Sequence, residues 1–201
     1  YSEESFTFYK EWYMKLFSTL SLSILVATAK PAIAAEYEFD PAHTNVFFTI
    51  DHFGTSTNHG AFHGIEGVVE VDRAAKTGNV SVAVPLSKLS TGNSGFDGHL
   101  KSADLFNAEK FPEITFKSNE WEFDGDKVKS IKGDLTLLGK TQPVVFEATK
   151  FNCYDSPKLK KEVCGGDFKT TLDRHQFGMD FLKGAITPTV EVTLQVEAVK
   201  K

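Results

Sequence analysis

The chain has 201 residues and a formal net charge of −5 at pH 7, with 22 Lys and Arg against 27 Asp and Glu. This negative balance argues against a nucleic-acid-binding protein, which needs clustered basic residues to neutralise phosphates. The densest basic run, 158–161, lies between the two cysteines, and we expect it on an exposed loop.

The N-terminal region has the organisation of a secretory signal peptide. A basic start precedes a fourteen-residue apolar run (16–29), and small residues in an A-x-A pattern follow it. A membrane anchor is the alternative, but the run is shorter than the ~20 residues that span a bilayer. We therefore expect an upstream segment at 1–13, a signal peptide at 14–34 that is cleaved after Ala34, and one exported domain at 35–201.

Cys153 and Cys164 are the only cysteines in the sequence. Because export places them in an oxidising compartment, we expect one disulfide, which contributes about 3 kcal/mol by closing a short loop. Two cysteines alone supply too few ligands for a structural zinc site.

Beyond residue 36 the dominant signal is an alternation of apolar and polar residues, which is typical of strands with one buried face. Short polar turns with glycine, such as 124–127 and 138–141, favour hairpins between antiparallel neighbours. The alternating runs are 46–52, 65–71, 80–86, 114–118, 121–123, 131–137, 144–148 and 190–198.

The stretch from 87 to 111 breaks this pattern. Asp97 is placed to cap a short helix, and Leu100, Ala103 and Phe106 recur at helical spacing. The sequence therefore predicts an all-β domain with a short helical insertion, which can lie across one end of a barrel.

Eight antiparallel strands can remove both exposed sheet edges by closing into a barrel. A small barrel either packs solid or holds one ligand. Fifteen of the eighteen phenylalanines follow residue 34, and this aromatic content fits both alternatives.

Three histidines, His52, His59 and His63, stand close together among glycines and small polar residues. A metal site needs imidazoles that converge on one point. We expect His52 to end a strand, His59 to lie in the connection and His63 to begin the next strand, with no carboxylate or cysteine at a familiar ligand spacing. We interpret them as a polar rim around an apolar interior and predict no metal and no cofactor.

Motifs of nucleophilic, phosphate-binding, zinc-dependent and dinucleotide-binding enzymes are not found in the sequence. A dispersed site built from Asp97, His99, Asp173 and His175 keeps an enzyme open as an alternative. We predict a binding protein without catalytic residues.

Five stretches carry a resemblance to a known family: YEFDPAHTNVFFTIDHFG, GAFHGIEGVVEVD, FDGHLKSADLFNAEKFPEITFKS, KGDLTLLGKTQPVVFEA and LDRHQFGMD. In this order and spacing they cover residues 36–199 and resemble the YceI-like proteins. The individual stretches are unspecific, and the ordered set carries the resemblance.

The resemblance implies a lipocalin-like fold, an extended eight-stranded antiparallel barrel that binds a polyisoprenoid chain in the periplasm of Gram-negative bacteria. It implies a carrier or storage protein for isoprenoid lipids, linked in some members to stress, often dimeric and without catalysis. The family often has an arginine before the aspartate of the helix motif, whereas this chain has Phe96 before Asp97. This difference favours an isoprenoid quinone such as ubiquinone over a polyprenyl derivative with a pyrophosphate head.

We therefore expect a periplasmic carrier of a long-chain isoprenoid lipid, which contacts membrane surfaces transiently and forms a homodimer; a surface or secreted location is the alternative. The rival function is a structural or stress-related interaction protein with a packed barrel. The head-group candidates are His52, His99, Arg174 and His175, for which a structural hydrogen bond or ion pair is the alternative. Strand parity gives the candidates for binding the chain, for which core packing is the alternative: Phe48, Ile50, Val69, Val82, Phe106, Phe116, Ile131, Leu135, Phe146 and Val192.

Overall fold

The structure is a computed structural model, and we describe its residues 34–201. The predicted upstream segment and signal peptide fall on residues 1–33 apart from Ala34, so both predictions lie outside the described residues. Between residues 34 and 201, no helix has the length and apolar character needed to span a membrane.

The described residues form mostly strands, with one α-helix and two 3-10 helices, η2 and η3. In chain order the elements are β1 (Ala35–Phe39), β2 (Asn45–His52), β3 (Ser56–Phe62), β4 (Val68–Asp72), β5 (Thr77–Pro85), η2 (Leu86–Lys88), β6 (Leu89–Ser90), α2 (Ser94–Lys101), β7 (Glu113–Asp124), β8 (Lys127–Leu137), β9 (Lys140–Ser156), β10 (Lys161–Asp173), η3 (Arg174–Phe177) and β11 (Thr189–Lys200).

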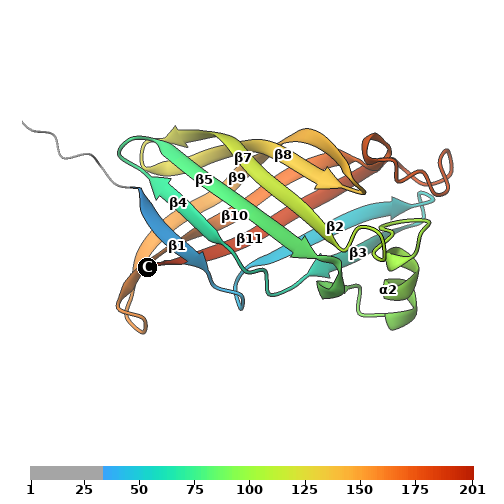
Figure 1. The fold of residues 1–201 in the computed structure, drawn as a ribbon, viewed down its shortest axis with the longest axis horizontal. Helices are drawn as coiled ribbons and strands as arrows, with labels where there is room; N and C mark the ends of the chain where they lie inside the picture. Colours follow the sequence, from blue (N-terminus) through green and yellow to red (C-terminus); the bar gives the residue numbers. More distant parts are fainter. Residues whose placement is uncertain (1–33) are drawn as a thin grey trace, which may run out of the picture. The chain divides into compact units, whose positions relative to one another are not determined.

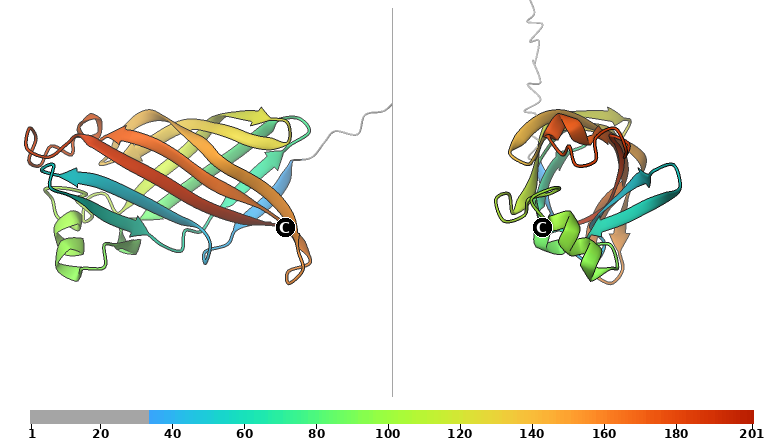
Figure 2. Two further views of the ribbon diagram at one scale, coloured as in Figure 1. Left: turned by 180° about the vertical axis from the view of Figure 1, so that it is seen from behind. Right: turned by 90° about the vertical axis from the view of Figure 1, so that its right-hand side faces the viewer.

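Eight of the strands in residues 34–201 form a closed antiparallel barrel, which confirms the predicted fold (Figure 1; Figure 2). The ring runs β1-β4-β5-β7-β8-β9-β10-β11 and closes where β11 pairs with β1. Two strands pair with the same edge of β11: residues 198–200 of β11 pair with β1, and residues 190–195 pair with β2. At the end of the barrel where β11 begins, β2, β3 and the short β6 extend the sheet.

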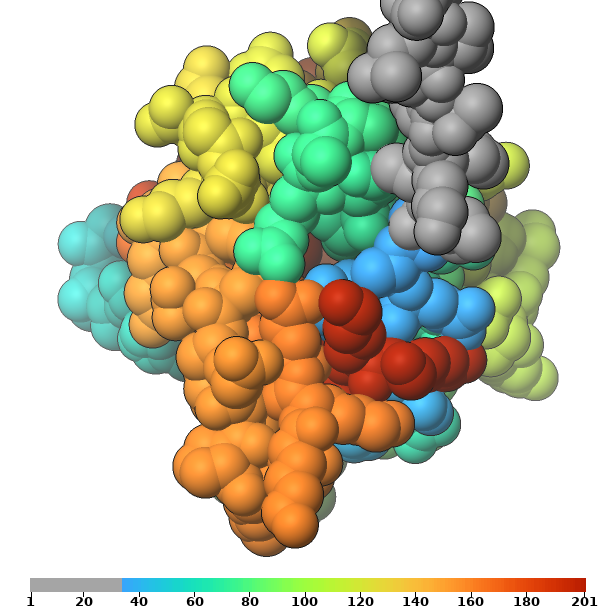
Figure 3. Space-filling model, turned by 90° about the vertical axis from the view of Figure 1, so that its left-hand side faces the viewer, coloured from blue at the N-terminus to red at the C-terminus, as the bar shows by residue number. Residues whose placement is uncertain are grey.

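The two ends of the barrel differ in the elements that form them (Figure 1; Figure 2). At one end lie α2, the β2–β3 turn and the loop 178–188 that precedes β11; we call it the mouth. At the other end lie the β4–β5, β7–β8 and β9–β10 turns together with the C-terminus; we call it the inner end. In Figure 3 the atoms of these turns, of β1 and of the C-terminal residues gather around the barrel axis.

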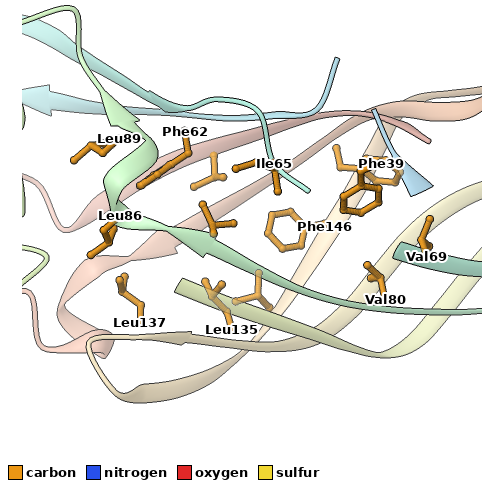
Figure 4. Packing of buried hydrophobic residues seen from close by; sticks show 14 of the residues in the cluster. Phe39, Phe62, Ile65, Val69, Val80, Leu86, Leu89, Leu135, Leu137 and Phe146 are labelled. Carbon is orange, nitrogen blue, oxygen red and sulfur yellow. The ribbon is translucent and has the colours of Figure 1, made fainter. Parts of the chain in front are cut away.

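The interior is built from the inward-facing positions of the alternating strands. In β8, for example, Leu135 and Leu137 are buried, whereas Asp134 before them is exposed and Thr136 between them is partly exposed. Figure 4 shows buried side chains from several strands pointing toward one another inside the barrel, among them Phe39, Phe62 and Phe146. The side chains that face the interior are thus those that the alternation of apolar and polar residues in the sequence predicted.

The runs 114–118 and 121–123, which we predicted as separate, belong to the single strand β7. The pairing of β7 with β8 shifts register between Ser118 and Glu120, as at a β-bulge. A bulge inserts one residue and moves the inward parity from even to odd positions. The alternation in the sequence therefore breaks although the strand continues.

Three strands have weak signals in the sequence. We predicted a connection where β3 lies, and β1 and β10 were not predicted as strands. β3 contains few β-branched residues, and pairing on both sides with β2 and β6 decides its conformation. The run predicted at 65–71 is also too long, because β4 begins only at Val68.

The helix is where we predicted it, but its start and its end differ. Asn93 caps α2 by accepting a hydrogen bond from the Phe96 backbone N–H, so the predicted cap, Asp97, is wrong. Asp97 lies inside the helix and accepts instead from the Thr91 backbone N–H and hydroxyl, each at 2.7 Å. α2 ends at Lys101, before Ala103 and Phe106.

The predicted disulfide is present between Cys153 and Cys164. The two residues face each other across β9 and β10, with Cα atoms 4.1 Å apart. It therefore ties two neighbouring strands of the barrel together near the inner end.

Candidate ligand-binding cavity

A cavity of about 400 Å³ runs along the inside of the barrel. Its lining extends from Tyr37 and Arg73 at the inner end to Phe181 and Leu182 at the mouth. Most lining residues are aliphatic or aromatic, so the cavity suits an elongated apolar ligand. The alternative of a barrel packed solid does not fit this interior.

Glycines on the barrel wall leave room for the aromatic side chains. A Cβ atom on Gly60 would overlap the ring of Phe48, and one on Gly78 would overlap the indole of Trp121. These rings therefore lie against the wall over a glycine, an arrangement known to protect glycines in sheets. We attribute the open interior in part to this arrangement, because rings held at the wall occupy less of the lumen.

All ten residues predicted to bind the apolar chain line the cavity. Five of them are buried and also belong to the hydrophobic cluster, namely Val69, Phe106, Leu135, Phe146 and Val192. The other five keep partial exposure: Phe48, Ile50, Val82, Phe116 and Ile131. The cavity wall and the core are thus the same set of side chains, so the two alternatives posed from the sequence were not exclusive.

Arg174, a head-group candidate, is committed to structural hydrogen bonds. It lines the cavity but is only 4% exposed. Its guanidinium donates to the carbonyl oxygens of Met179, Phe181, Ile186 and Thr187, at 2.7 to 3.2 Å. Burial lowers the pKa of Arg174, with partial compensation by Asp180 and Asp173. Arg174 therefore shapes the loop 178–188 from inside, which leaves it poorly placed to bind a ligand head.

The other three candidates divide between the cavity and the surface loop. His52 and His99 line the cavity near the mouth. The ring of His99 lies edge-on to Phe181, 5.3 Å between centroids, so α2 touches the loop 178–188 there. His175 does not line the cavity, and its Nδ1 lies 2.9 Å from Asp180 Oδ1.

The structure separates the three histidines of the sequence cluster. His52 pairs with Ser56 beside the β2–β3 turn, whereas His63 follows the far end of β3 and lies 3.0 Å from Asn45 Oδ1. Six residues of strand between these positions span roughly 20 Å. His59 lies within β3 opposite Thr49, where we had predicted a loop. The three imidazoles therefore do not converge on one point.

The residues of the alternative enzyme site have separate partners as well. Asp97 accepts hydrogen bonds from Thr91, and Asp173 accepts one from the His175 backbone N–H. His99 stacks near Phe96, and His175 pairs with Asp180. In residues 34–201, the one group of at least three metal-ligand side chains, Cys153, Glu162 and Cys164, includes both sulfurs of the disulfide.

No pattern in the sequence indicates the polar cluster at the inner end. Tyr37, Arg73 and Glu162 meet there, and Tyr37 and Arg73 line the cavity. They are far apart in the sequence and come from β1, the β4–β5 turn and β10. Only the pairing of β1 with β4 and β11 and of β10 with β11 brings them together, so no local motif could have revealed them.

A barrel closed by strand pairing around an elongated apolar cavity has the architecture of the class of small barrels that hold hydrophobic ligands. This chain belongs to the YceI-like family, whose domain model matches residues 37–198. A UPF0312 protein of Pseudomonas putida is 34% identical over 190 residues, which cover 93% of this chain and 98% of the relative.

Solved structures share the fold. The YceI protein of Campylobacter jejuni superimposes with a TM-score of 0.63 at 24% identity, over 76% of this chain and 90% of that one. A polyisoprenoid binding domain from Saccharophagus degradans, implicated in plant cell wall breakdown, gives 0.57 at 12% identity, over 84% of this chain and 99% of that domain.

Proposed function

We propose that this protein binds and carries a long-chain isoprenoid lipid in its barrel, without catalysing a reaction. The apolar cavity that follows the barrel axis carries this proposal. Burying apolar surface contributes ~25 cal/mol per Å², or about 0.8 kcal/mol per methylene group, so the chain should dominate affinity. The shared fold of the polyisoprenoid binding domain from Saccharophagus degradans supports the ligand class.

We favour an isoprenoid quinone over a polyprenyl phosphate as the ligand. Phe96, at the position of the family's arginine, lines the cavity with an apolar ring. Arg174 donates to four carbonyl oxygens and offers little to a phosphate. A periplasmic location agrees with the disulfide, which persists in oxidising compartments. The homodimer stays a prediction.

Lipid extraction tests the carrier function directly. Mass spectrometry of organic extracts from gently purified protein should recover an isoprenoid lipid near one molecule per chain. In Val192→Phe a larger ring projects into the middle of the cavity, and we expect the recovered lipid to fall severalfold. Thr193→Phe adds the same ring at the neighbouring, opposite-parity position of β11 and should retain lipid. Wild-type protein that carries and takes up no isoprenoid lipid would refute the carrier function.

We further propose that the mouth docks on a membrane surface to exchange the lipid. Phe53 is 52% exposed in the β2–β3 turn, and Leu182 is 43% exposed in the loop 178–188. Both have positive φ, 60° and 52°, a conformation that non-glycine residues seldom adopt. Exposed apolar side chains can insert into a membrane interface, and these two are on loop tips at the mouth of an apolar cavity. The contact of His99 with Phe181 is then the point where docking opens the mouth.

Vesicle flotation tests the docking surface. Phe53→Ser/Leu182→Ser should lower the fraction bound to phospholipid vesicles and slow lipid transfer between them. Leu159→Ser is the matched control, because Leu159 is 46% exposed in the β9–β10 turn at the inner end. Equal losses in both variants would show that exposed apolar area, irrespective of the end, causes binding.

A further inference from the structure

Glu162 is the centre of a partly buried polar cluster at the inner end. Its Oε1 accepts hydrogen bonds from the Tyr37 hydroxyl at 2.7 Å and from Lys200 Nζ at 3.3 Å. Its Oε2 accepts one from Arg73 Nη2 at 2.6 Å. Tyr37 and Lys200 face each other across β1 and β11, so the closure of the barrel assembles the cluster. Two cations surround one carboxylate, which leaves the cluster with an excess of positive charge.

The protonation states at neutral pH follow from these contacts. Burial, together with the Glu162 carboxylate, raises the pKa of Tyr37 to about 12, so the phenol keeps its proton. The hydrogen bond from Tyr37, assisted by Lys200 and Arg73, lowers the pKa of Glu162, so the carboxylate is ionised. The ionised Glu162 carboxylate therefore holds the donor groups of Tyr37, Arg73 and Lys200 in place.

Arg73 has donors left for a ligand. A guanidinium carries five N–H groups, and among residues 34–201 Arg73 uses one of them, on Glu162. Arg73 lines the cavity, as Arg174 does, but Arg174 donates to four carbonyl oxygens. Of these two arginines in the cavity lining, Arg73 at the inner end is therefore the one whose guanidinium can still donate to an oxygen atom of a ligand.

A second donor at the same end lacks a partner. The indole N–H of Trp121 is buried and has no hydrogen-bond acceptor among the described residues. Trp121 lines the cavity, and its ring covers Gly78, which pairs with Val71, two residues before Arg73. Because buried donors are nearly always satisfied, an unpaired N–H in the cavity lining at the inner end indicates an acceptor that a ligand supplies when the ring adjusts to it.

We propose that the lipid binds with its oxygen-bearing head at the inner end, where Arg73 and Trp121 donate to it, and with its isoprenoid chain toward the mouth. This inference rests on the proposed carrier function. It reverses the head-group position that we expected near His52 and His99. The mouth contributes the apolar side chains of Phe96, Phe181 and Leu182 to the lining, against which the chain can pack.

The cluster selects an uncharged head with carbonyl oxygens. The excess positive charge of the cluster lies on Lys200, which is 46% exposed and is not a lining residue of the cavity. Arg73, which lines the cavity, is paired with Glu162 at 2.6 Å, and the Glu162 carboxylate repels an incoming phosphate. A quinone carbonyl needs only N–H donors, which the cluster supplies. The class of ligand is therefore a prenylated quinone.

The test compares a prenylated benzoquinone with an isoprenoid hydrocarbon of the same chain length. Quenching of Trp121 fluorescence, in a Trp12→Phe background of the full chain, reports quinone binding, and displacement of the quinone reports the hydrocarbon. Arg73→Met should weaken quinone binding about tenfold, the loss of one charged hydrogen bond, and change hydrocarbon binding less than twofold. Unchanged hydrocarbon binding also shows that the barrel is intact.

Matched variants decide between the two ends. Lys76→Met removes a cation from the same β4–β5 turn but leaves Arg73, and it should bind the quinone as the wild type does. Arg73→Lys keeps the charge beside Glu162 and should restore part of the affinity. His52→Ala/His99→Ala should have little effect on either ligand.

Three results would overturn the proposal. If His52→Ala/His99→Ala loses the quinone and Arg73→Met does not, the head lies at the mouth. If a polyprenyl phosphate binds more tightly than the quinone and depends on Arg73, the uncharged head is wrong. If Arg73→Met weakens quinone and hydrocarbon equally, Arg73 only supports the fold. Binding of neither ligand to the wild type would instead refute the carrier function itself.

Discussion

The mouth and the inner end each place an arginine in the cavity lining, and the two arginines have opposite roles. At the mouth, Arg174 donates to carbonyl oxygens of the loop 178–188 and holds it in shape. At the inner end, Arg73 shares one carboxylate with Tyr37 and Lys200 and keeps donors in reserve. The partners of a charged side chain, more than its residue type or its place in a cavity, thus decide whether it supports structure or binds a ligand.

Replacing Arg174 should have the largest effect on stability. Arg174→Met leaves buried carbonyl oxygens without donors, and we expect a loss of about 3–4 kcal/mol of unfolding free energy, measured by urea denaturation. The loop 178–188 should also become sensitive to proteases. Arg73→Met is the matched control and should cost less than half as much, because Arg73 makes one hydrogen bond to protein. A larger cost for Arg73 would contradict the comparison of the two arginines.

Removing the disulfide should have the next largest effect. Cys153→Ser/Cys164→Ser should lose about 3 kcal/mol, since the cross-link no longer restricts the unfolded chain. Denaturation with and without reductant measures this loss, and the variant should not respond to reductant. Because the bond ties β9 to β10 at the inner end, docking on vesicles through the mouth should be unchanged. Loss of docking in the variant would show that the two ends are coupled.

Tyr37 should make stability depend on alkaline pH. Its pKa is about 12 in the folded protein, against about 10 in the unfolded chain. The unfolded chain therefore loses its proton first, and stability should fall as the pH rises from about 10 to about 12, by at most about 2 kcal/mol. Unfolding free energies of wild type and Tyr37→Phe at both ends of this range measure the effect. Tyr154→Phe is the control at an exposed tyrosine, whose pKa the charge of Glu197 also raises, and it should keep most of the wild-type fall.

The sequence predicted the barrel and its cavity wall because both depend on local alternation. Val192 and Leu135 line the interior as their parity indicated. The predictions failed where long-range pairing decides the outcome, as in β3, whose residues are poor strand formers between two paired neighbours. They also failed for the polar inner end, since Arg73 and Glu162 are 89 residues apart. A resemblance to a family identified Arg174 as a candidate but could not show which partners saturate it.

The smallest expected effect separates function from stability at the mouth. Phe53 has a left-handed backbone conformation that costs a phenylalanine about 1–2 kcal/mol but suits asparagine. Phe53→Asn should therefore raise the unfolding free energy by about 0.5–1 kcal/mol, after the loss of the ring contact with His52. Thermal denaturation should show an increase of about 2–4 °C, whereas Leu159→Asn, whose φ is not positive, should show none. Vesicle flotation of the same variants should rank them in the opposite order. If Phe53→Asn is stabilised and still docks normally, Phe53 is not needed for membrane contact. A residue that adopts the left-handed conformation at a lower energetic cost would then serve equally well at this loop tip.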